Sequence, residues 1–400
     1  MQFCPGLGLP SDQLKIIGVT GANGKTTTSC LIAGVLSHAG HKVGLLSKLG
    51  YFDGEDVEDA PRAPPSPNQL TVLFARMAHN GCSYAVMEVS SRALEQSLVF
   101  PEWFDAVCLT NVTRDYLDGN ITHKDYRPIK SRLFDRLRGD AFVAINADDP
   151  ISADYLPRLS GPVLTVGINS PAELTGTPIE QCPSEQTFLI TAGSETAPVR
   201  TRMIGRHHIY NCLSAAAVGL AYGVELPRIV RTLEAAQHVP GRLERIECGQ
   251  PFSVFVDFAH TPDALAGCLH TLRTVTQGRV ICVFGDGGES NESKRLQMGR
   301  AVEKGADLAI VTSGNPLDDE PMASIRHLLN GFQKPDRVEV IPERLAAIHR
   351  ALSSARGGDC VLIAGKGYET CQIDGEDDLS PVDYQIASDW LYEVQPYAKG

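Results

Sequence analysis

Short apolar runs and helical stretches alternate along most of this chain, and no other feature of the sequence restricts its fold as strongly. An apolar run at residues 14–20 precedes a helical stretch at about 26–38, and a second apolar run follows at 42–47. The same alternation resumes at about residue 253 and continues to about residue 364. Strands that alternate with helices form parallel sheets with crossover connections. We therefore expect an α/β protein with a mostly parallel sheet in its first half and a Rossmann-like sheet in its C-terminal part.

The middle of the chain has a different pattern. From about Gly139 the apolar runs FVAIN, VLTVGI, TFLIT and VRTRMI are short and are separated by Gly, Pro, Ser and Asp. This spacing predicts a small antiparallel subsheet appended to the first sheet. Helices are expected at about 211–222 and 227–235.

The segment HVPGRLERIE, with Pro240-Gly241 as a helix breaker, is typical of a hinge. Because 400 residues suffice for several domains, we predict two of them, residues 1–242 and residues 243–400. We expect only a short helix in the tail after Trp390.

Composition narrows the functional classes. The net charge is -12 at pH 7, and no basic cluster is evident, so we expect no binding of nucleic acid or of an anionic membrane surface. No apolar run has the length of a membrane span, and the N-terminus has no basic segment followed by an apolar one. The eleven cysteines form no C-x-x-C pair and are expected to be reduced structural thiols. These features predict a cytoplasmic protein without a membrane span.

The strongest local signal is the segment TGANGKTTT at residues 20–28, between a predicted strand and a predicted helix. Such a loop presents backbone N–H groups to phosphate oxygens, while its lysine contacts phosphates and a hydroxyl holds Mg²⁺. Val19 stands where the strict motif has its first glycine, and a glycine-lysine turn without a ligand is the alternative. We predict that the nucleotide-binding residues are Gly21, Asn23, Gly24, Lys25, Thr26 and Thr27.

Two more predicted strands end in polar residues. MEVSS at 87–91 places Glu88 at a strand end, where its carboxylate could bind the cation that bridges phosphates, although a plain surface carboxylate is the alternative. LTNVTRD at 109–115 likewise follows an apolar strand.

In this order the chain contains the motifs TGANGKTTT, MEVSS, LTNVTRDYLD, YRPIKSRLF, INADDP, GRHHIYNCLSAAA, VPGRLER, VDFAHTPDAL, VFGDGG, TSGNP and AGKGYETCQ. With them the sequence resembles the Mur ligase superfamily, most closely its muramyl-tripeptide synthetase branch. The resemblance implies an ATP- and Mg²⁺-dependent ligase that activates a small-molecule acid as an acyl phosphate and joins it to an amino acid. It also implies a role in the synthesis of peptidoglycan precursors.

The resemblance implies roles for individual residues. Lys130 matches a lysine that CO₂ carbamylates, which would make it a Mg²⁺ ligand together with Thr26 and Glu88, whereas an unmodified surface lysine is the alternative. The catalytic residues would be Lys25, Glu88 and Lys130. The further nucleotide-binding residues would be Asn111, Asn211, Arg242, Asp257 and His260, the last of which could instead cap the following helix. The substrate-binding residues would be Ser66, Ser90, Arg114, Asn315, Gly365 and Glu369.

The sequence also departs from the family pattern. Tyr116 replaces a histidine that binds a second magnesium ion, and phenol is a poor ligand for Mg²⁺. Gly314 and Leu317 replace the aspartate and arginine of the motif D-N-P-R, and Ser290 replaces another arginine. Without that aspartate and arginine the chain lacks a bidentate contact for a carboxylate of the substrate, so meso-diaminopimelate is poorly supported as the amino acid.

Only 23 residues precede Gly24, whereas full-length relatives carry a uridine-nucleotide-binding domain there. We expect that domain to be absent and a separate polypeptide to be a candidate for its role. Two alternatives remain open, a ligase similar to folylpolyglutamate or cyanophycin synthetases and a non-catalytic ATP-binding paralogue that partners cell-wall enzymes.

Overall fold

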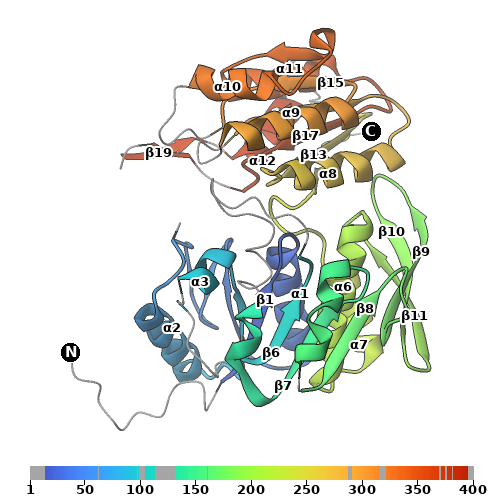
Figure 1. The fold of residues 1–400 in the computed structure, drawn as a ribbon. Coiled ribbons are helices and arrows are strands. Elements are labelled where there is room, and N and C mark those ends of the chain that lie inside the picture. Colours follow the sequence, from blue (N-terminus) through green and yellow to red (C-terminus); the bar gives the residue numbers. More distant parts are fainter. Residues whose placement is uncertain are drawn as a thin grey trace.

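The computed structural model describes residues 14–61, 63–96, 98, 104–112, 131–159, 161–286, 291–314, 321–368, 371–373, 376–380 and 382–394. Two α/β units lie one above the other, the first built around an eleven-stranded sheet and the second around a six-stranded sheet (Figure 1). Several residues singled out from the sequence lie outside the described residues, namely Arg114, Tyr116, Lys130, Ser290, Asn315, Leu317 and Glu369.

The first sheet has the strand order β11-β10-β9-β8-β7-β6-β1-β5-β2-β3-β4. Its central strand β1 pairs in parallel with β5 and with β6, so the loop that follows β1 lies between the ends of two neighbouring strands. The strands are β1 (Lys15–Thr20), β2 (Val43–Ser47), β3 (Gly50–Phe52), β4 (Val57–Glu58), β5 (Tyr84–Glu88), β6 (Phe104–Leu109), β7 (Leu137–Asn146), β8 (Val163–Gly167), β9 (Leu174–Gln181), β10 (Gln186–Ala192) and β11 (Glu195–Thr201).

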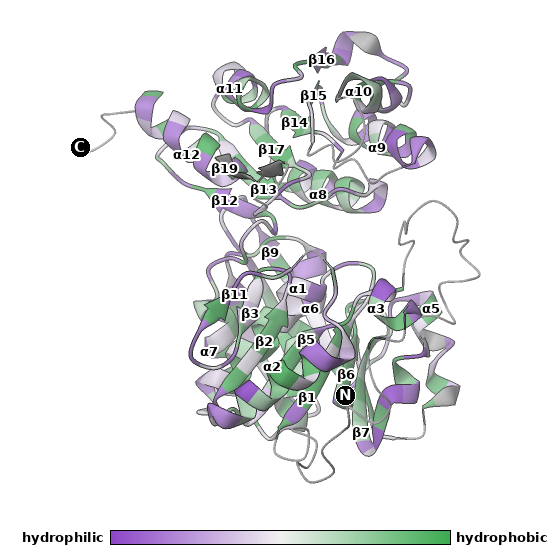
Figure 2. Cartoon of the chain, turned by 90° about the vertical axis from the view of Figure 1, so that its left-hand side faces the viewer, coloured by the Kyte–Doolittle hydropathy of each residue, from purple (hydrophilic) through white to green (hydrophobic). Residues whose placement is uncertain are grey.

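Helices cover both faces of this sheet, because its central strands are apolar on both sides. One face packs against α1 (Lys25–His38), α6 (Arg206–Ala221) and α7 (Leu226–Ala235). The other packs against α2 (Pro67–His79) and α3 (Ser91–Glu95), and the short α5 (Pro150–Ala153) joins β7 to β8. In Figure 2 the apolar residues gather on the central strands of the sheet.

The prediction for the middle of the chain was correct only in part. Strands β9, β10 and β11 are antiparallel, but the runs FVAIN and VLTVGI form β7 and β8, which pair in parallel with their neighbours. The carboxylate of Asp148 accepts hydrogen bonds from the backbone N–H groups of Ile168 (2.6 Å), Asn169 (2.9 Å) and Ser170 (2.6 Å). These hydrogen bonds hold the turn between β8 and β9, after which β9 pairs with β8 in parallel. The apolar runs of the sequence alone do not predict this parallel pairing.

The second sheet has the order β12-β13-β17-β14-β15-β16, and only β12 is antiparallel to its neighbour. Its strands are β12 (Glu244–Ile246), β13 (Ser253–Asp257), β14 (Val280–Phe284), β15 (Leu308–Val311), β16 (Val338–Val340) and β17 (Cys360–Ala364). One face packs against α8 (Pro262–Val275), α9 (Glu292–Gly305) and α10 (Pro321–Leu329), the other against α11 (Arg344–Ser354) and α12 (Asp383–Val394). A hairpin of β18 (Cys371–Ile373) and β19 (Glu376–Ser380) precedes α12.

The expectation of only a short helix after Trp390 was wrong, because α12 begins at Asp383 and contains Trp390. The buried Asp383 carboxylate accepts hydrogen bonds from Nε (2.7 Å) and Nη2 (2.6 Å) of Arg344. This bidentate ion pair ties the first turn of α12 to α11. No described helix is long and apolar enough to cross a membrane.

The chain passes from one unit to the other between α7 and β12. Gly241 has φ 62° there, and Leu243 has φ 48°, an uncommon conformation for a residue with a side chain. A Cβ at Gly241 would lie 2.6 Å from the backbone nitrogen of Tyr368. The predicted hinge is therefore a segment where two stretches of backbone pack closely.

Candidate active site

The loop at residues 21–24 joins β1 to α1 and can be formed only by glycine at two positions. Gly21 has φ 153° and Gly24 has φ 83°. A Cβ at Gly21 would collide with Oγ1 of Thr110, and one at Gly24 would lie 2.5 Å from Oδ1 of Asn211. No side chain caps the N-terminus of α1, so the loop and the helix end offer backbone N–H groups and a partial positive charge to an anion.

The ammonium group of Lys25 lies inside this loop. Its Nζ donates hydrogen bonds to the backbone carbonyls of Gly21 (2.8 Å) and Ala22 (2.9 Å). The positive charge is thus held next to the N–H groups that would bind phosphate. Thr27, predicted as a further nucleotide ligand, is buried in the first turn of α1.

Two residues that follow β6 form hydrogen bonds with the loop at residues 21–24. Asn111 accepts a hydrogen bond from the backbone nitrogen of Asn23 (3.0 Å) and donates one to its carbonyl oxygen (2.9 Å). Thr110 donates a further hydrogen bond to the same carbonyl (2.6 Å). In this structure Asn111 therefore supports the loop.

Glu88, at the end of β5, lies beside the first turn of α1. Its Oε2 accepts a hydrogen bond from Oγ1 of Thr26 (3.1 Å), and its Oε1 accepts one from the backbone nitrogen of Lys48 (2.9 Å). A hydroxyl and a carboxylate at this distance can share a Mg²⁺ ion, which binds oxygen and completes its octahedron with water and phosphate. Within the described ranges no three His, Cys, Asp or Glu residues are grouped to hold a metal alone.

A cavity of about 110 Å³ opens beside this pair. Lys25, Glu88 and Ser90 are among its polar lining residues, and prolines and apolar side chains form much of the rest. Its lining residues are Lys25, Leu46, Ser47, Lys48, Tyr51, Ala60, Pro61, Pro64, Pro65, Leu70, Met87, Glu88, Ser90, Ala93 and Leu98. The cavity thus places open space directly beside Lys25 and Glu88.

The two serines predicted to bind substrate both cap helices. Oγ of Ser90 accepts a hydrogen bond from the backbone nitrogen of Ala93 (3.1 Å) at the start of α3. Ser66 and Gln69 form a reciprocal capping box at the start of α2. Ser90 lines the cavity as well, whereas Ser66 is not among the lining residues.

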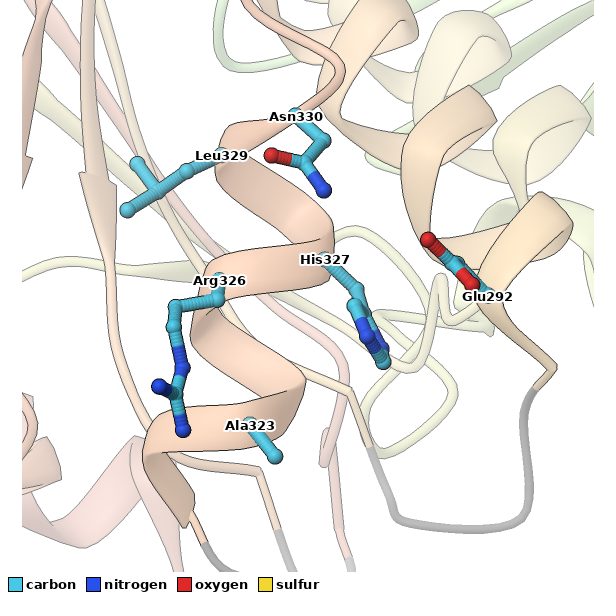
Figure 3. Close-up of a pocket in the computed structure, with 6 residues that line it drawn as sticks. All are labelled: Glu292, Ala323, Arg326, His327, Leu329 and Asn330. Carbon is cyan, nitrogen blue, oxygen red and sulfur yellow. The ribbon is translucent and has the colours of Figure 1, made fainter.

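A larger cavity of about 510 Å³ lies in the second unit, where the first residue of α9 faces α10 and the residue that follows α10 (Figure 3). Its lining residues are Glu292, Ala323, Arg326, His327, Leu329 and Asn330. None of the residues predicted to carry chemistry lines it, so size alone does not identify the reactive centre.

Arg242, at the hinge, reaches the nucleotide loop. Its Nη2 donates a hydrogen bond to Oγ1 of Thr26 (2.9 Å). Its guanidinium carbon lies 4.8 Å from the ring centre of Phe258 and 5.9 Å from that of Tyr368. The structure thus brings together Lys25, Thr26, Glu88 and Arg242.

Asp257, at the end of β13, forms hydrogen bonds with backbone groups in and near the hinge segment. Its carboxylate accepts hydrogen bonds from the backbone nitrogens of Leu243 (2.6 Å) and Ala259 (2.7 Å). Burial raises the pKa of this carboxyl above its usual range. Asp257 thereby stabilises the uncommon backbone conformation of Leu243.

His260 is not the helix cap that the sequence left open as an alternative, because Thr261 is the N-cap residue of α8. Nδ1 of His260 lies 2.9 Å from the carbonyl oxygen of Phe258. Burial, together with the positive charges of Lys294 and Lys48, lowers the pKa of His260 to about 3. The ring is therefore neutral at pH 7, and its Nδ1–H donates to that carbonyl.

Gly365, predicted to bind substrate, has φ 112° and packs tightly against the strand end after β14. A Cβ there would lie 3.0 Å from the carbonyl oxygen of Gly285. Its backbone nitrogen donates to the carbonyl oxygen of Asp257 (3.0 Å). The need for glycine at this position follows from packing.

Two buried polar residues lie in the N-terminal half of α6, and one of them was not identified from the sequence. Oδ1 of Asn211 accepts a hydrogen bond from Oγ1 of Thr28 (3.2 Å). One turn earlier, His208 is 1% exposed, yet neither ring nitrogen has a hydrogen-bond partner in the structure. Buried polar groups are almost always satisfied, so a neutral imidazole with unmet hydrogen bonds fits a site that receives a polar ligand. The signal in the sequence was the polar pair His207-His208 at the start of an apolar helix.

Comparison with known protein families shows to which family the chain belongs. The family model of the Mur ligase middle domain matches residues 19–219, and that of the Mur ligase, glutamate ligase domain matches residues 241–367. The chain belongs to the Mur ligase family. Members of this family are ATP-dependent ligases that form amide bonds, so the family and the enzyme class predicted from the sequence are confirmed.

Among the relatives, the UDP-N-acetylmuramoyl-L-alanyl-D-glutamate–2,6-diaminopimelate ligase of Geobacillus thermodenitrificans is 38% identical over 387 residues, 95% of this chain and 79% of the relative. A solved structure of a ligase with the same description is 27% identical with a TM-score of 0.67, over 96% of this chain and 79% of that one. Folylpolyglutamate synthase from Mycobacterium tuberculosis in complex with ADP is 19% identical with a TM-score of 0.70, over 89% and 88% of the two chains. The predicted α/β fold class is thereby confirmed.

Proposed function

We propose that this Mur ligase uses ATP to join an amino acid to a muramyl-peptide-like acid in the synthesis of peptidoglycan precursors. Phosphoryl transfer to the carboxylate of the acid would give an acyl phosphate, and the amine would then displace phosphate to form the amide. The observation that carries the proposal is the convergence of Lys25, Thr26 and Glu88 from two elements of the first unit with Arg242 from the hinge. Phosphoryl transfer needs such positioning and neutralisation of charge more than it needs acid-base chemistry.

Each of these residues has a role that follows from its place. The N–H groups at 21–24 and the Lys25 ammonium would bind the phosphates of ATP, while Thr26 and Glu88 would hold Mg²⁺. Arg242 would add a second positive charge from the other side of Thr26. Asn211 lies on α6 beside Gly24, and His208, one turn earlier on α6, has two ring nitrogens without a partner. Both residues would receive another part of the nucleotide.

Further roles rest on the sequence motifs, because the residues concerned lie outside those that the structure describes. A carbamylated Lys130 would supply a third oxygen ligand to the metal. Arg114, Asn315 and Glu369 would contact the acid and the amino acid.

The choice of amino acid is proposed to differ from that of the relatives named for 2,6-diaminopimelate. Gly314 and Leu317 replace the aspartate and the arginine of the D-N-P-R motif. Without a guanidinium fork at that position, a second carboxylate of the amino acid has no bidentate partner there. We infer an amino acid whose recognition does not depend on such a carboxylate.

The organisation of the chain supports a domain boundary between residues 242 and 243. The first sheet ends with β11 and the second begins with β12, on either side of the hinge. A cytoplasmic location agrees with the free thiols of the nine cysteines from Cys30 to Cys360.

The experiment that tests this function is ADP release by the purified protein, measured with panels of acids and amino acids. We expect release that requires one acid, one amino acid and Mg²⁺, together with a product whose mass shows the new amide bond. Activity with a folate or an amino-acid polymer in place of a muramyl peptide would assign the alternative acid substrate. Nucleotide binding without ligation by any pair would contradict the ligase activity and favour a non-catalytic role.

A further inference from the structure

The aromatic ring of Phe258 contacts two cations that come from different parts of the molecule. Phe258 follows β13 in the second unit. The guanidinium carbon of Arg242 lies 4.8 Å from its ring centre, and Nζ of Lys48, which follows β2 in the first unit, lies 5.0 Å from it. Both distances are within the range of cation–π attraction.

The same two residues also form hydrogen bonds with Thr26 and Glu88, the residues proposed to hold Mg²⁺. Arg242 donates a hydrogen bond to Oγ1 of Thr26 (2.9 Å), and the backbone nitrogen of Lys48 donates one to Glu88 (2.9 Å). Thr26 and Glu88 are joined to each other by a hydrogen bond of 3.1 Å. The contacts therefore form a closed ring of five residues across the two units, Arg242–Thr26–Glu88–Lys48–Phe258.

Phe258 is held more firmly than either cation. It is 7% exposed, its backbone nitrogen donates to the carbonyl of Gly241 (2.8 Å), and its ring stacks on Tyr368 with centres 5.6 Å apart. His260 packs edge-on against it with ring centres 4.6 Å apart. The ring is thus fixed by the hinge segment, whereas the cations are on flexible side chains.

We propose that Phe258 is a positioning residue that holds Arg242 and Lys48 at the phosphate end of the nucleotide. The proposal rests on the function proposed above. Arg242 and Lys48 bring two positive charges to one ring, and Lys25 lines the same cavity as Lys48 and Glu88. Like charges repel. The electron-rich face of the buried Phe258 ring offsets part of this repulsion, and it keeps the two cations in position for the polyphosphate.

The test compares Phe258→Leu, which removes the π face, with Phe258→Tyr, which keeps it. Each variant is measured for equilibrium binding of a non-hydrolysable ATP analogue with Mg²⁺, for KM and kcat in the ligation assay, and for thermal unfolding without ligand. We expect Phe258→Leu to weaken binding of the analogue roughly tenfold or more, since two cation–π contacts are lost. Phe258→Tyr is expected to bind within about twofold of the unmodified protein, because its ring offers a comparable face.

A matched control removes an aromatic ring elsewhere in the same unit. Phe332 packs on the core of the second sheet and contacts Phe284, with ring centres 6.3 Å apart. Phe332→Leu should lower thermal stability while leaving the affinity for the analogue unchanged. If it weakens binding as much as Phe258→Leu does, general loosening explains the effect and the proposal is wrong.

A second variant tests the same contact from the first unit. Lys48→Met removes the charge on an exposed side chain, while the backbone hydrogen bond to Glu88 remains possible. We expect Lys48→Met to weaken binding severalfold and to have a smaller effect in the Phe258→Leu background, since each change removes the same contact. Fully additive effects, or binding by Phe258→Leu equal to that of the unmodified protein, would overturn the positioning role. Failure of the unmodified protein to bind the analogue at all would instead overturn the proposed function itself.

Discussion

The two units of this Mur ligase use their polar residues differently. In the first unit, Lys25, Thr26 and Glu88 turn their charged or hydroxyl groups toward one point beside the loop. In the second unit, Asp257 and Gly365 form hydrogen bonds with backbone of their own unit or of the hinge, and Arg242 of the hinge contacts Thr26 of the first unit. The first unit thus contains the ammonium, hydroxyl and carboxylate groups of the candidate active site. The second unit stabilises the hinge segment, from which the guanidinium group of Arg242 reaches that site.

The largest effect should come from the charge inside the loop. Lys25→Ala removes the ammonium group that would neutralise the phosphates, and we expect the rate of ADP release to fall roughly 10²–10³-fold. Lys42→Ala is a matched control, since Lys42 is a lysine of the same unit that pairs with Glu55 (3.0 Å) at the surface. Both proteins should melt at nearly the same temperature. Activity of Lys25→Ala within a few-fold of the control would show that the loop does not carry the chemistry.

A slightly smaller effect is expected at Lys130. If carbamylation supplies a metal ligand, Lys130→Ala should lower ligation by about a hundredfold, a typical cost of removing one group that stabilises the charge of the transition state. The unmodified protein should lose activity when CO₂ is removed and regain it with bicarbonate, whereas the variant should not respond. Full activity of Lys130→Ala, or indifference of the unmodified protein to bicarbonate, would exclude the carbamate.

The third prediction concerns stability of the second unit. Asp257→Asn places an amide N–H₂ where a backbone N–H needs an acceptor, so we expect a loss of about 1–3 kcal/mol in the free energy of unfolding. Urea titrations of both proteins over a range of pH measure this loss.

The pH dependence of those titrations gives a separate check. Burial raises the pKa of Asp257 above its ordinary value of 3.8, so between these two pKa values the folded state binds more protons than the unfolded state. This group therefore lowers stability as the pH rises from about 3.8 through the folded-state pKa. Asp257→Asn should lack that contribution. Equal slopes in the two proteins would show that the carboxyl is not perturbed by folding.

Much of this architecture was predictable from sequence because it rests on local patterns. The β1-loop-α1 unit follows from an apolar run, two glycines and a lysine, and Glu88 was placed correctly at the end of a strand. The parallel pairing of β8 and β9 was missed because the turn between them is held by Asp148, some twenty residues earlier in the chain. The backbone role of Asp257 was missed for a similar reason, since the conformation of Leu243 that it stabilises has no signature in the sequence.

His208 gives the smallest expected effect, and it tests whether the first unit keeps a polar group unsatisfied for its ligand. Burial holds its pKa well below the ordinary value of 6.5, so the ring is neutral and its two nitrogens lack partners in the absence of ligand. His208→Leu should therefore raise the free energy of unfolding of the free protein by up to about 1 kcal/mol, because an unsatisfied polar group is replaced by an apolar one. The same change should weaken ATP binding severalfold, as titration calorimetry with a non-hydrolysable analogue would show.

Cys212→Ala, one turn further along α6, serves as the control, since it should lower stability through lost packing and leave ATP affinity unchanged. A His208→Leu protein that is less stable and binds ATP normally would mean that the imidazole serves the core, and the contrast between the two units would then rest on Lys25, Thr26 and Glu88 alone.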